Sequence, residues 1–163
     1  IESGYDVKMS EVHGMSQRGG SVSTQVRYGK KVYSPIIGNG SADLLVSFEE
    51  MEAARYLKQL KPGGKIVVNT LQIPPMPVLS GKKKYPQTIM EELKKKAAVL
   101  PLNATQIATQ LGNPKSANIV LLGALVKALD LTDIDWKEII VRTVKPQFAE
   151  INLKAFDVGM AAV

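Results

Sequence analysis

Cysteine is absent from the 163 residues of this chain, which also hold only one histidine, one tryptophan and three phenylalanines. A chain without cysteine forms no disulfide and offers no thiolate to zinc or to an iron–sulfur cluster. Any redox metal that works with this protein must therefore sit on another polypeptide. No basic start followed by an apolar core marks a secretory signal, and no apolar run is long enough to span a bilayer. We expect a cytoplasmic protein that makes no membrane contact.

The residues that are present have ordinary globular proportions. Hydrophobic residues make up 45% of the chain and charged residues 22%, and the length suits one compact domain with its own core. The net charge of +6 and the pI of about 9.5 favour anionic ligands or partners, such as phosphorylated compounds, acidic proteins or nucleic acid. The few aromatic residues are not interleaved with a basic strand face, as they are in base-stacking platforms, so we do not expect nucleic-acid binding.

The first forty residues predict antiparallel strands. β-rich runs cover Ser21 to Tyr28 and Lys31 to Ile37, and Gly29-Lys30 between them suits a tight hairpin. The opening residues resemble the tail of a helix that stops at Gly4 and leads into a strand. We therefore expect a strand and a helix of the same fold to precede Ile1.

The next segment has the pattern of a parallel strand–helix–strand unit. Apolar runs at Leu44 to Phe48 and Ile66 to Val68 flank a helix from about Glu49 to Leu60, and a turn is expected at Pro62 to Gly64. The two runs lack polar alternation, which is typical of strands that helices cover on both faces. This segment predicts neighbouring strands of a parallel sheet.

Helices dominate the rest of the chain. After a proline-rich connection we expect a helix near Gln87 to Lys96, a short strand in AAVLPLNA, and helices over residues 105–110, 117–129, 135–144 and 147–160. The helix over 117–129 is apolar nearly all round, so we expect it to be buried. The predicted fold is α/β: a Rossmann-like three-layer open sheet, mostly parallel, with an antiparallel hairpin and a helical C-terminal part. In such sheets ligands bind at the carboxyl ends of the parallel strands.

The polar stretch SEVHGMSQRGG, Ser10 to Gly20, is the first candidate site. Arg18 with Gly19 and Gly20 suits a backbone nest that holds a phosphate or carboxylate, and Ser16 adds a further donor. The spacing matches neither the Walker nor the dinucleotide-binding pattern, and a strand rather than a helix is expected to follow. The alternative is a sharp turn between strands, which is a common role of glycine. From the residues alone, the turn is the favoured of the two interpretations.

Two further features are candidates. His13 is the one histidine and so the one imidazole general base in the chain, but a lone histidine is more often a structural hydrogen-bonding residue. The lysines of GKKKYP, Gly81 to Pro86, suit an acidic partner or a diphosphate, although consecutive lysines in a loop are usually just solvated.

Longer motifs resemble one family. SEVHGMSQRGGSVSTQVRYGKKVYSPII, followed by ADLLVSFEEMEAARYLKQLKPGGKIVVNT, resembles the gamma-type domain of pyruvate/ketoisovalerate ferredoxin oxidoreductases. The SEVHGMSQRGG string resembles in particular the beta subunits of the indolepyruvate branch. ANIVLLGALVKAL and NLKAFDVG, which contains Asn152, Ala155, Phe156 and Gly159, extend the resemblance over essentially the whole chain.

The resemblance implies a non-cluster subunit of an enzyme that oxidatively decarboxylates indolepyruvate or another aryl pyruvate to an acyl-coenzyme A. In this family thiamine diphosphate, its Mg²⁺ and the [4Fe–4S] clusters lie in a large alpha subunit, and the electrons pass to ferredoxin. No cofactor is then expected within this chain, which is expected to be inactive alone, and coenzyme A is a co-substrate. Ser16, Arg18, Gly19 and Gly20 become candidates for contact with coenzyme A or with the partner subunit.

The resemblance also implies one domain over residues 1–163 that lacks the family's N-terminal strand, its glycine-rich loop and most of its first helix. Other functions stay open: the gamma subunit of a related pyruvate, 2-oxoisovalerate or 2-oxoglutarate oxidoreductase, or a purely structural partner subunit. A free-standing nucleotide-binding enzyme would suit the sheet, but a complete phosphate-binding pattern is missing. An isolated chain with an exposed interface is also able to pair as a homodimer.

Overall fold

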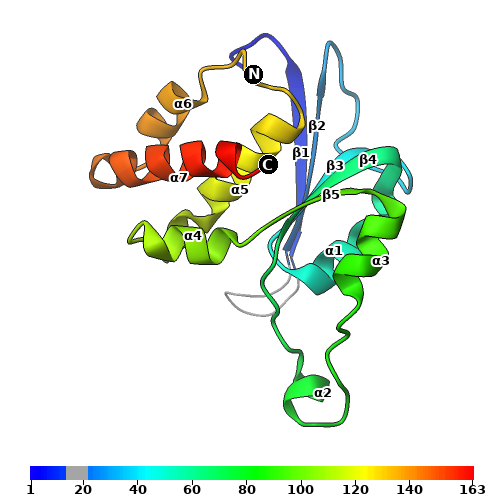
Figure 1. Ribbon diagram of the computed structural model, residues 1–163. Coiled ribbons are helices and arrows are strands. Elements are labelled where there is room, and N and C mark those ends of the chain that lie inside the picture. The colour runs from blue at the N-terminus through cyan, green and yellow to red at the C-terminus, as the bar shows by residue number, and fades with distance from the viewer. Residues whose placement is uncertain (14–21) are drawn as a thin grey trace.

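The computed structural model of the protein describes residues 1–13 and 22–163. Within them, a parallel sheet has the strand order β3 (Ala42–Ser47), β4 (Leu60–Asn69), β5 (Ala98–Leu102). A separate two-stranded antiparallel sheet consists of β1 (Asp6–His13) and β2 (Val22–Gly29), and Figure 1 shows it beside the parallel sheet. The three-layer α/β architecture expected from the sequence is confirmed.

One face of the parallel sheet is covered by the two crossover helices. α1 (Glu50–Tyr56) connects β3 to β4, and α3 (Ile89–Lys96) precedes β5. Ile66 and Val68 of β4 point to this side, where they pack in one core cluster with Ala53 of α1 and Leu93 of α3.

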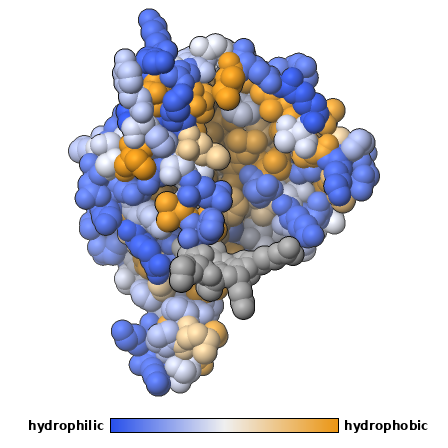
Figure 2. All heavy atoms as spheres, turned by 180° about the vertical axis from the view of Figure 1, so that it is seen from behind, coloured by the Kyte–Doolittle hydropathy of each residue, from blue (hydrophilic) through white to orange (hydrophobic). Residues whose placement is uncertain are grey.

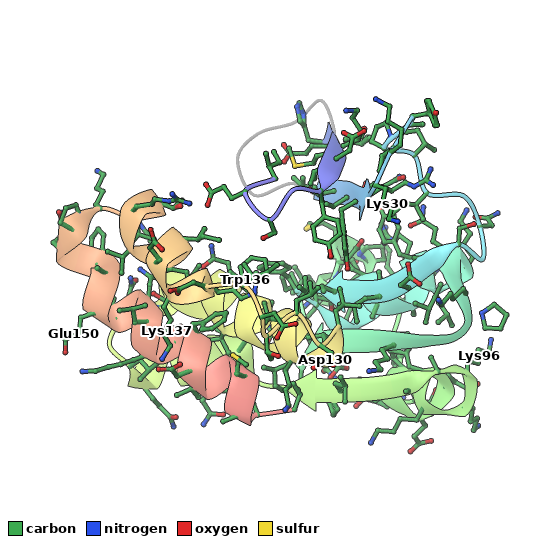
Figure 3. All side chains as sticks on the ribbon, turned by 90° about the horizontal axis from the view of Figure 1, so that it is seen from above. Lys30, Lys96, Asp130, Trp136, Lys137 and Glu150 are labelled. Carbon is green, nitrogen blue, oxygen red and sulfur yellow. The ribbon has the colours of Figure 1, made fainter. Side chains whose placement is uncertain are left out.

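The helical half of the chain covers the opposite face of the sheet. It contains α4 (Ala104–Gln110), α5 (Ala117–Ala128), α6 (Trp136–Thr143) and α7 (Ala149–Ala161). Val67 of β4 points to this side and packs against the helical half. Because both faces of the sheet are covered, Ile66, Val67 and Val68 are all fully buried, although their side chains alternate between the two faces. This explains the unbroken apolar run in the sequence. Figure 3 shows the two halves from above, with Lys96 on the sheet side and Glu150 on the helical side.

Three short 3₁₀ segments and one isolated helix complete the part of the chain that the structure describes. The 3₁₀ segments cover Leu57–Gln59, Pro114–Ser116 and Pro146–Phe148. The isolated helix, α2 (Met76–Leu79), lies at the end of a long excursion between β4 and α3 and projects away from both halves (Figure 1). No helix in the described part of the chain is both long and apolar enough to cross a membrane.

The prediction that residues 21–28 pair with residues 31–37 in a hairpin is wrong. β2 pairs with β1, with Met9 opposite Val26, and residues 31–37 form no strand. Pro35 lacks the N–H that a strand pairing needs, and this segment instead lies against side chains of the hairpin. The N–H groups of Val32 and Ile37 donate to the side chains of Asp6 (3.0 Å) and Gln25 (2.5 Å).

The two faces of this hairpin are covered unequally. In an antiparallel pair, residues directly opposite one another share a face, so Asp6, Lys8, Gln25 and Arg27 lie on the face that residues 31–37 cover. The other face carries apolar side chains that are 43–64% exposed: Met9, Val22, Val26 and Tyr28, with Tyr5 against Tyr28 at a ring-centroid distance of 5.6 Å. The apolar face of the hairpin is thus the one left open within the described residues.

Two local expectations are corrected. Residues 1–4 form a turn, closed by the N–H of Gly4 donating to the carbonyl of Ile1 at 2.9 Å, rather than the tail of a helix. Pro62 to Gly64 lie inside β4 rather than in a turn before it, and the register between β3 and β4 shifts at this point. Gly63 has φ +77°, a conformation that side chains resist, so the glycine permits this irregularity.

Helices α5 and α7 contact one another in the core through two glycines. A Cβ on Gly123 would lie 2.8 Å from the backbone nitrogen of Met160, and nearer still to the carbonyl of Phe156. A Cβ on Gly159 would overlap the backbone of Val120. The two C-terminal motifs that resemble the family therefore pack against one another, backbone to backbone.

We expect Gly159→Ala to lower the free energy of unfolding by about 1–3 kcal/mol or more, because the added methyl group forces α5 and α7 apart. Urea unfolding followed by far-UV circular dichroism measures this change. Gly38→Ala is the control, because a Cβ at Gly38 has no neighbour closer than 3.9 Å. Equal stability of the two variants would contradict the tight helix crossing.

Candidate functional site at the carboxyl edge of the parallel sheet

Buried polar side chains gather where the parallel strands end. β3, β4 and β5 end at Ser47, Asn69 and Leu102, and because the strands are parallel these ends share one edge of the sheet. Four of the six buried polar residues in the described part of the chain lie here, namely Ser47, Glu49, Glu50 and Asn69. This is the edge at which open α/β sheets bind ligands.

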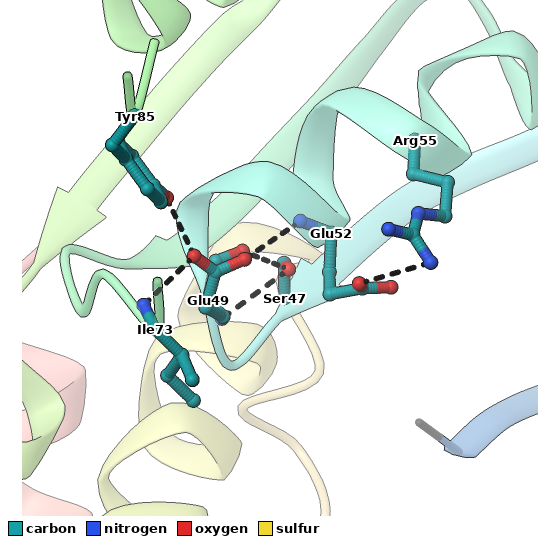
Figure 4. A network of polar contacts seen from close by, with 6 residues as sticks. All are labelled: Ser47, Glu49, Glu52, Arg55, Ile73 and Tyr85. Atoms are coloured by element: carbon teal, nitrogen blue, oxygen red, sulfur yellow. Dashed lines mark hydrogen bonds and ion pairs between the residues drawn. The ribbon is translucent and has the colours of Figure 1, made fainter. Parts of the chain in front are cut away.

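The carboxylate of Glu49 is the centre of a polar network at this edge (Figure 4). One of its oxygens accepts hydrogen bonds from the Tyr85 hydroxyl at 2.6 Å and from the N–H of Ile73 at 3.2 Å. The other oxygen accepts from the N–H of Glu52 at 2.9 Å. Glu49 is only 6% exposed, so the three donors replace the water that its charge has lost.

The local sequence explains why Glu49 takes this position. Its backbone is extended, with φ −156° and ψ 146°, so the chain leaves β3 and enters α1 with Glu49 as the N-cap. The hydroxyl of Ser47 donates to the carbonyl of Glu49 at 2.6 Å and holds the turn. A carboxylate at the N-terminus of a helix also interacts favourably with the helix dipole.

Glu50 and Asn69 connect the ends of β3 and β4. The carboxylate of Glu50 accepts from the side-chain amide of Gln72 at 2.9 Å, and its N–H donates to the carbonyl of Leu71 at 3.1 Å. The amide of Asn69 donates to the carbonyl of Phe48 at 3.0 Å and to the hydroxyl of Thr105 at 2.9 Å. The side-chain oxygen of Asn69 is buried and accepts no hydrogen bond within the described residues.

Tyr85 is part of the same network and is itself 8% exposed. Burial, and then the hydrogen bond to Glu49, raise the pKa of its hydroxyl above the usual tyrosine value, so the proton stays on Tyr85 at neutral pH. Within this network Tyr85 is therefore a donor and Glu49 an acceptor. The hydrogen bond between Tyr85 and Glu49 fixes the position of the chain segment that carries Tyr85 relative to the start of α1.

The structure places only part of the candidate loop. Ser10 and His13 belong to β1, where the exposed His13 pairs with Val22 at the end of the hairpin. Ser16, Arg18, Gly19 and Gly20 lie outside the described residues, so their role stays a prediction. The lysines of GKKKYP, by contrast, are described: Lys82, Lys83 and Lys84 are all exposed on the excursion that carries α2.

Sequence reasoning missed Glu49, Glu50, Asn69 and Tyr85 as site residues. A signal for the two glutamates was present, because they follow directly after the apolar run at Leu44 to Phe48. Charged residues just past a buried strand of a parallel sheet lie at the edge where ligands bind. Tyr85 carried no such signal, since 36 residues separate it from Glu49.

The described residues include no group of three or more His, Cys, Asp and Glu side chains that is able to hold a metal ion. A cavity of about 380 Å³ lies elsewhere, between the loop before α6 and helix α7, with Val126, Trp136, Phe156 and Met160 in its lining. Trp136 also closes this loop, because its indole N–H donates to the carbonyl of Leu131 at 2.8 Å. The residues at the carboxyl edge bind and position chain segments.

The fold and this edge define an α/β domain of the open-sheet class, in which partners and ligands meet the carboxyl ends of the strands. The particular family follows from the sequence. Residues 1–162 match the family described as pyruvate ferredoxin/flavodoxin oxidoreductase, and the chain belongs to that family.

Among proteins of this family, the chain is similar to subunits named for indolepyruvate oxidoreductase. The indolepyruvate oxidoreductase subunit IorB of Pyrococcus horikoshii is 40% identical over 170 residues, which cover 99% of this chain and 83% of the relative. The subunit of the same name from Archaeoglobus fulgidus is 38% identical, over 98% of this chain and 81% of the relative.

Solved structures share the fold. The gamma subunit of a keto/oxoacid ferredoxin oxidoreductase from Geobacter sulfurreducens matches with a TM-score of 0.67 and 23% identity, over 99% of this chain and 82% of that one. A 2-oxoglutarate:ferredoxin oxidoreductase from Magnetococcus marinus, solved with 2-oxoglutarate, coenzyme A and succinyl-CoA bound, matches with the same TM-score and 22% identity, over 98% of this chain and 26% of that one.

We expect Tyr85→Phe to lower the free energy of unfolding by about 1 kcal/mol at neutral pH, because Glu49 loses one of its three donors. Thermal unfolding by calorimetry measures the loss. Tyr33→Phe is the matched control, since the side chain of Tyr33 is 90% exposed. A loss of the same size in both variants would contradict the role of the hydrogen bond.

The natural chain and Tyr85→Phe are also expected to differ in how their stability depends on pH. The pKa of Tyr85 is raised in the folded chain, so above the ordinary tyrosine pKa of about 10 the unfolded chain loses this proton first. The stability that Tyr85 contributes is therefore complete below about pH 9 and falls as the pH rises further. The difference in unfolding free energy between the natural chain and Tyr85→Phe is expected to shrink between about pH 9 and 11.5. A constant difference over this range would contradict the raised pKa.

Proposed function

We propose that this chain is the non-cluster subunit of an indolepyruvate:ferredoxin oxidoreductase, an enzyme complex that oxidatively decarboxylates aryl pyruvates to acyl-coenzyme A. The observation that carries the proposal is the 38–40% identity to IorB subunits over nearly the whole chain. The family match over residues 1–162 supports the reaction class. Related pyruvate, 2-oxoisovalerate or 2-oxoglutarate oxidoreductases are the alternative, and the names of these relatives favour indolepyruvate.

The donor chemistry of the chain supports a division of labour within the complex. An iron–sulfur cluster needs cysteine thiolates, and the chain has none. Magnesium-bound thiamine diphosphate is typically held by a Gly-Asp-Gly to Asn-Asn type motif, and the sequence contains no recognisable motif of this kind. The residues present do not fit these groups, so we assign thiamine diphosphate, Mg²⁺ and the [4Fe–4S] clusters to the larger partner subunit, which passes electrons to ferredoxin.

Within this complex we assign the stretch Ser10 to Gly20, which begins in β1 and continues into the loop after His13, to contact with coenzyme A or with the partner subunit. Arg18 would pair with a phosphate or carboxylate oxygen, Gly19 and Gly20 would allow close backbone approach, and Ser16 would add a hydroxyl donor. The net charge of +6 supports an anionic ligand. His13, exposed at the end of β1, is suited to hydrogen bonding beside this loop.

The same resemblance supports a proposal about the open face of the hairpin. We assign its cover to a strand and a helix of the same polypeptide that come before Ile1. Two observations support this: the exposed apolar face with Met9 and Val26, and the position of β3 as an edge strand of the described sheet. An isolated two-stranded hairpin is marginally stable, so such a face needs a cover.

The experiment that tests the function is anaerobic co-production of the chain with the large thiamine and iron–sulfur subunit from the same source. Indolepyruvate-dependent reduction of a low-potential dye is then measured with and without coenzyme A. Activity that requires both chains and coenzyme A is the expected result. Equal activity of the large subunit alone would favour a purely structural role for this chain.

We expect Arg18→Ala to reduce the turnover of that complex by about 10- to 150-fold, which corresponds to the loss of one charge-assisted hydrogen bond of about 1.5–3 kcal/mol. Thermal stability is expected to change far less, because the loss is specific to the ligand. Arg55→Ala is the matched control, since Arg55 forms an exposed ion pair with Glu52 at 3.4 Å. Parallel losses of turnover and stability in Arg18→Ala would restore the interpretation of the loop as a turn.

A further inference from the structure

The excursion between β4 and α3 projects from the described part of the molecule (Figure 1). Residues 71–86, called the arm below, leave the carboxyl end of β4, carry the short helix α2 at their tip and return to α3 (Figure 1). Of these residues, only Tyr85 is buried, and Leu71 and Val78 are half-buried. The projection contributes little to the core, so its length calls for another physical explanation.

The base of the arm is held closed by one buried carboxylate. Glu49 accepts from the N–H of Ile73 on the outgoing side and from the hydroxyl of Tyr85 on the returning side, at 3.2 and 2.6 Å. Gln72 adds a second attachment through Glu50 at 2.9 Å. Figure 4 shows both sides of the arm converging on Glu49. The arm therefore leaves the sheet in a defined direction.

The tip of the arm is ordered by its own backbone. The N–H groups of Val78 and Leu79 donate to the carbonyl of Pro75 at 2.8 and 3.0 Å, and that of Lys83 donates to the carbonyl of Pro77 at 2.9 Å. Prolines 74, 75, 77 and 86 further restrict the backbone. A segment that is ordered before binding loses less conformational entropy on binding.

The surface of the arm combines exposed apolar side chains with one sign of charge. Ile73, Met76 and Leu79 are 60%, 73% and 66% exposed. Lys82, Lys83 and Lys84 follow directly, and residues 71–86 contain no aspartate or glutamate. Figure 2 shows the arm as a lobe below the body, with hydrophobic and hydrophilic spheres side by side.

We propose that the arm is a docking element that inserts Met76 and Leu79 into an apolar groove flanked by acidic side chains on the larger partner subunit. This inference rests on the proposed function for the identity of the partner. The chemistry of the groove follows from the arm: two flexible or branched apolar side chains need an apolar pocket, and three adjacent lysines need carboxylates beside it.

The charge and the apolar side chains of the arm favour an acidic protein groove over a second copy of the chain or nucleic acid. A second copy of the chain would bring another protein with a net charge of +6 toward the lysines. Nucleic acid would satisfy the lysines, but phosphates leave Met76 and Leu79 without an apolar partner. An acidic protein groove satisfies both features of the arm.

The test uses the full chain and its larger subunit, produced from the same source, with the dissociation constant measured by biolayer interferometry under anaerobic conditions. Met76→Ser/Leu79→Ser is expected to weaken binding by at least about tenfold, as for apolar anchors at the centre of interfaces. Lys82→Glu/Lys83→Glu is expected to weaken binding by a similar factor and to reduce its dependence on salt. All these side chains are exposed, so the folded chain is expected to unfold at an unchanged temperature.

Two matched controls carry the same chemical changes elsewhere. Tyr33→Ser/Ile36→Ser replaces two exposed side chains outside the arm, 90% and 57% exposed. Lys115→Glu/Lys145→Glu changes the net charge by the same amount at two exposed lysines of the helical half. Both controls are expected to bind like the natural chain.

The outcomes separate the arm from the proposed function. Normal binding by both arm variants overturns the docking role and leaves the proposed function intact. Failure of the natural chain to bind the larger subunit overturns both. Salt-sensitive binding of the isolated natural chain to duplex DNA, lost in Lys82→Glu/Lys83→Glu, would assign the arm to nucleic acid and overturn the proposal.

Discussion

A single buried carboxylate connects most of the features described above. Glu49 ends the turn after β3, caps α1 and holds both sides of the arm, and it does so with two backbone N–H groups and one tyrosine hydroxyl. A buried charge is costly unless hydrogen bonds replace its water, so the position of each donor is constrained by the others. The direction of the arm therefore depends on the geometry of the sheet edge.

The chain divides into parts that stabilise and parts that present surface. The parallel sheet is buried on both faces, and the crossing of α5 and α7 through Gly123 and Gly159 leaves no space for a side chain. Two described surfaces remain without a cover: the apolar face of the hairpin and the tip of the arm. In a subunit of a larger oxidoreductase, such surfaces are expected where other chains or ligands meet the domain.

The family motifs and the functional candidates have different physical roles. Gly123, Ala155, Phe156 and Gly159 are packing residues, because they lie in the α5–α7 contact. Their similarity to a family indicates a shared fold and says little about chemistry. The polar residues that bind and position chain segments lie instead at the strand ends, where the backbone has donors and acceptors that no helix or strand uses.

The amino-acid sequence predicts the parallel strands, the crossover helices and the buried helix α5, because all of them follow from apolar runs and their periods. The composition also shows that this chain offers no cysteine thiolate to an iron–sulfur cluster, because it contains no cysteine. The pairing of segments that are distant in the sequence becomes visible only in the folded chain. β2 pairs with β1 rather than with residues 31–37, and Tyr85 meets Glu49 across 36 residues, because these contacts depend on how distant segments pack rather than on local propensity.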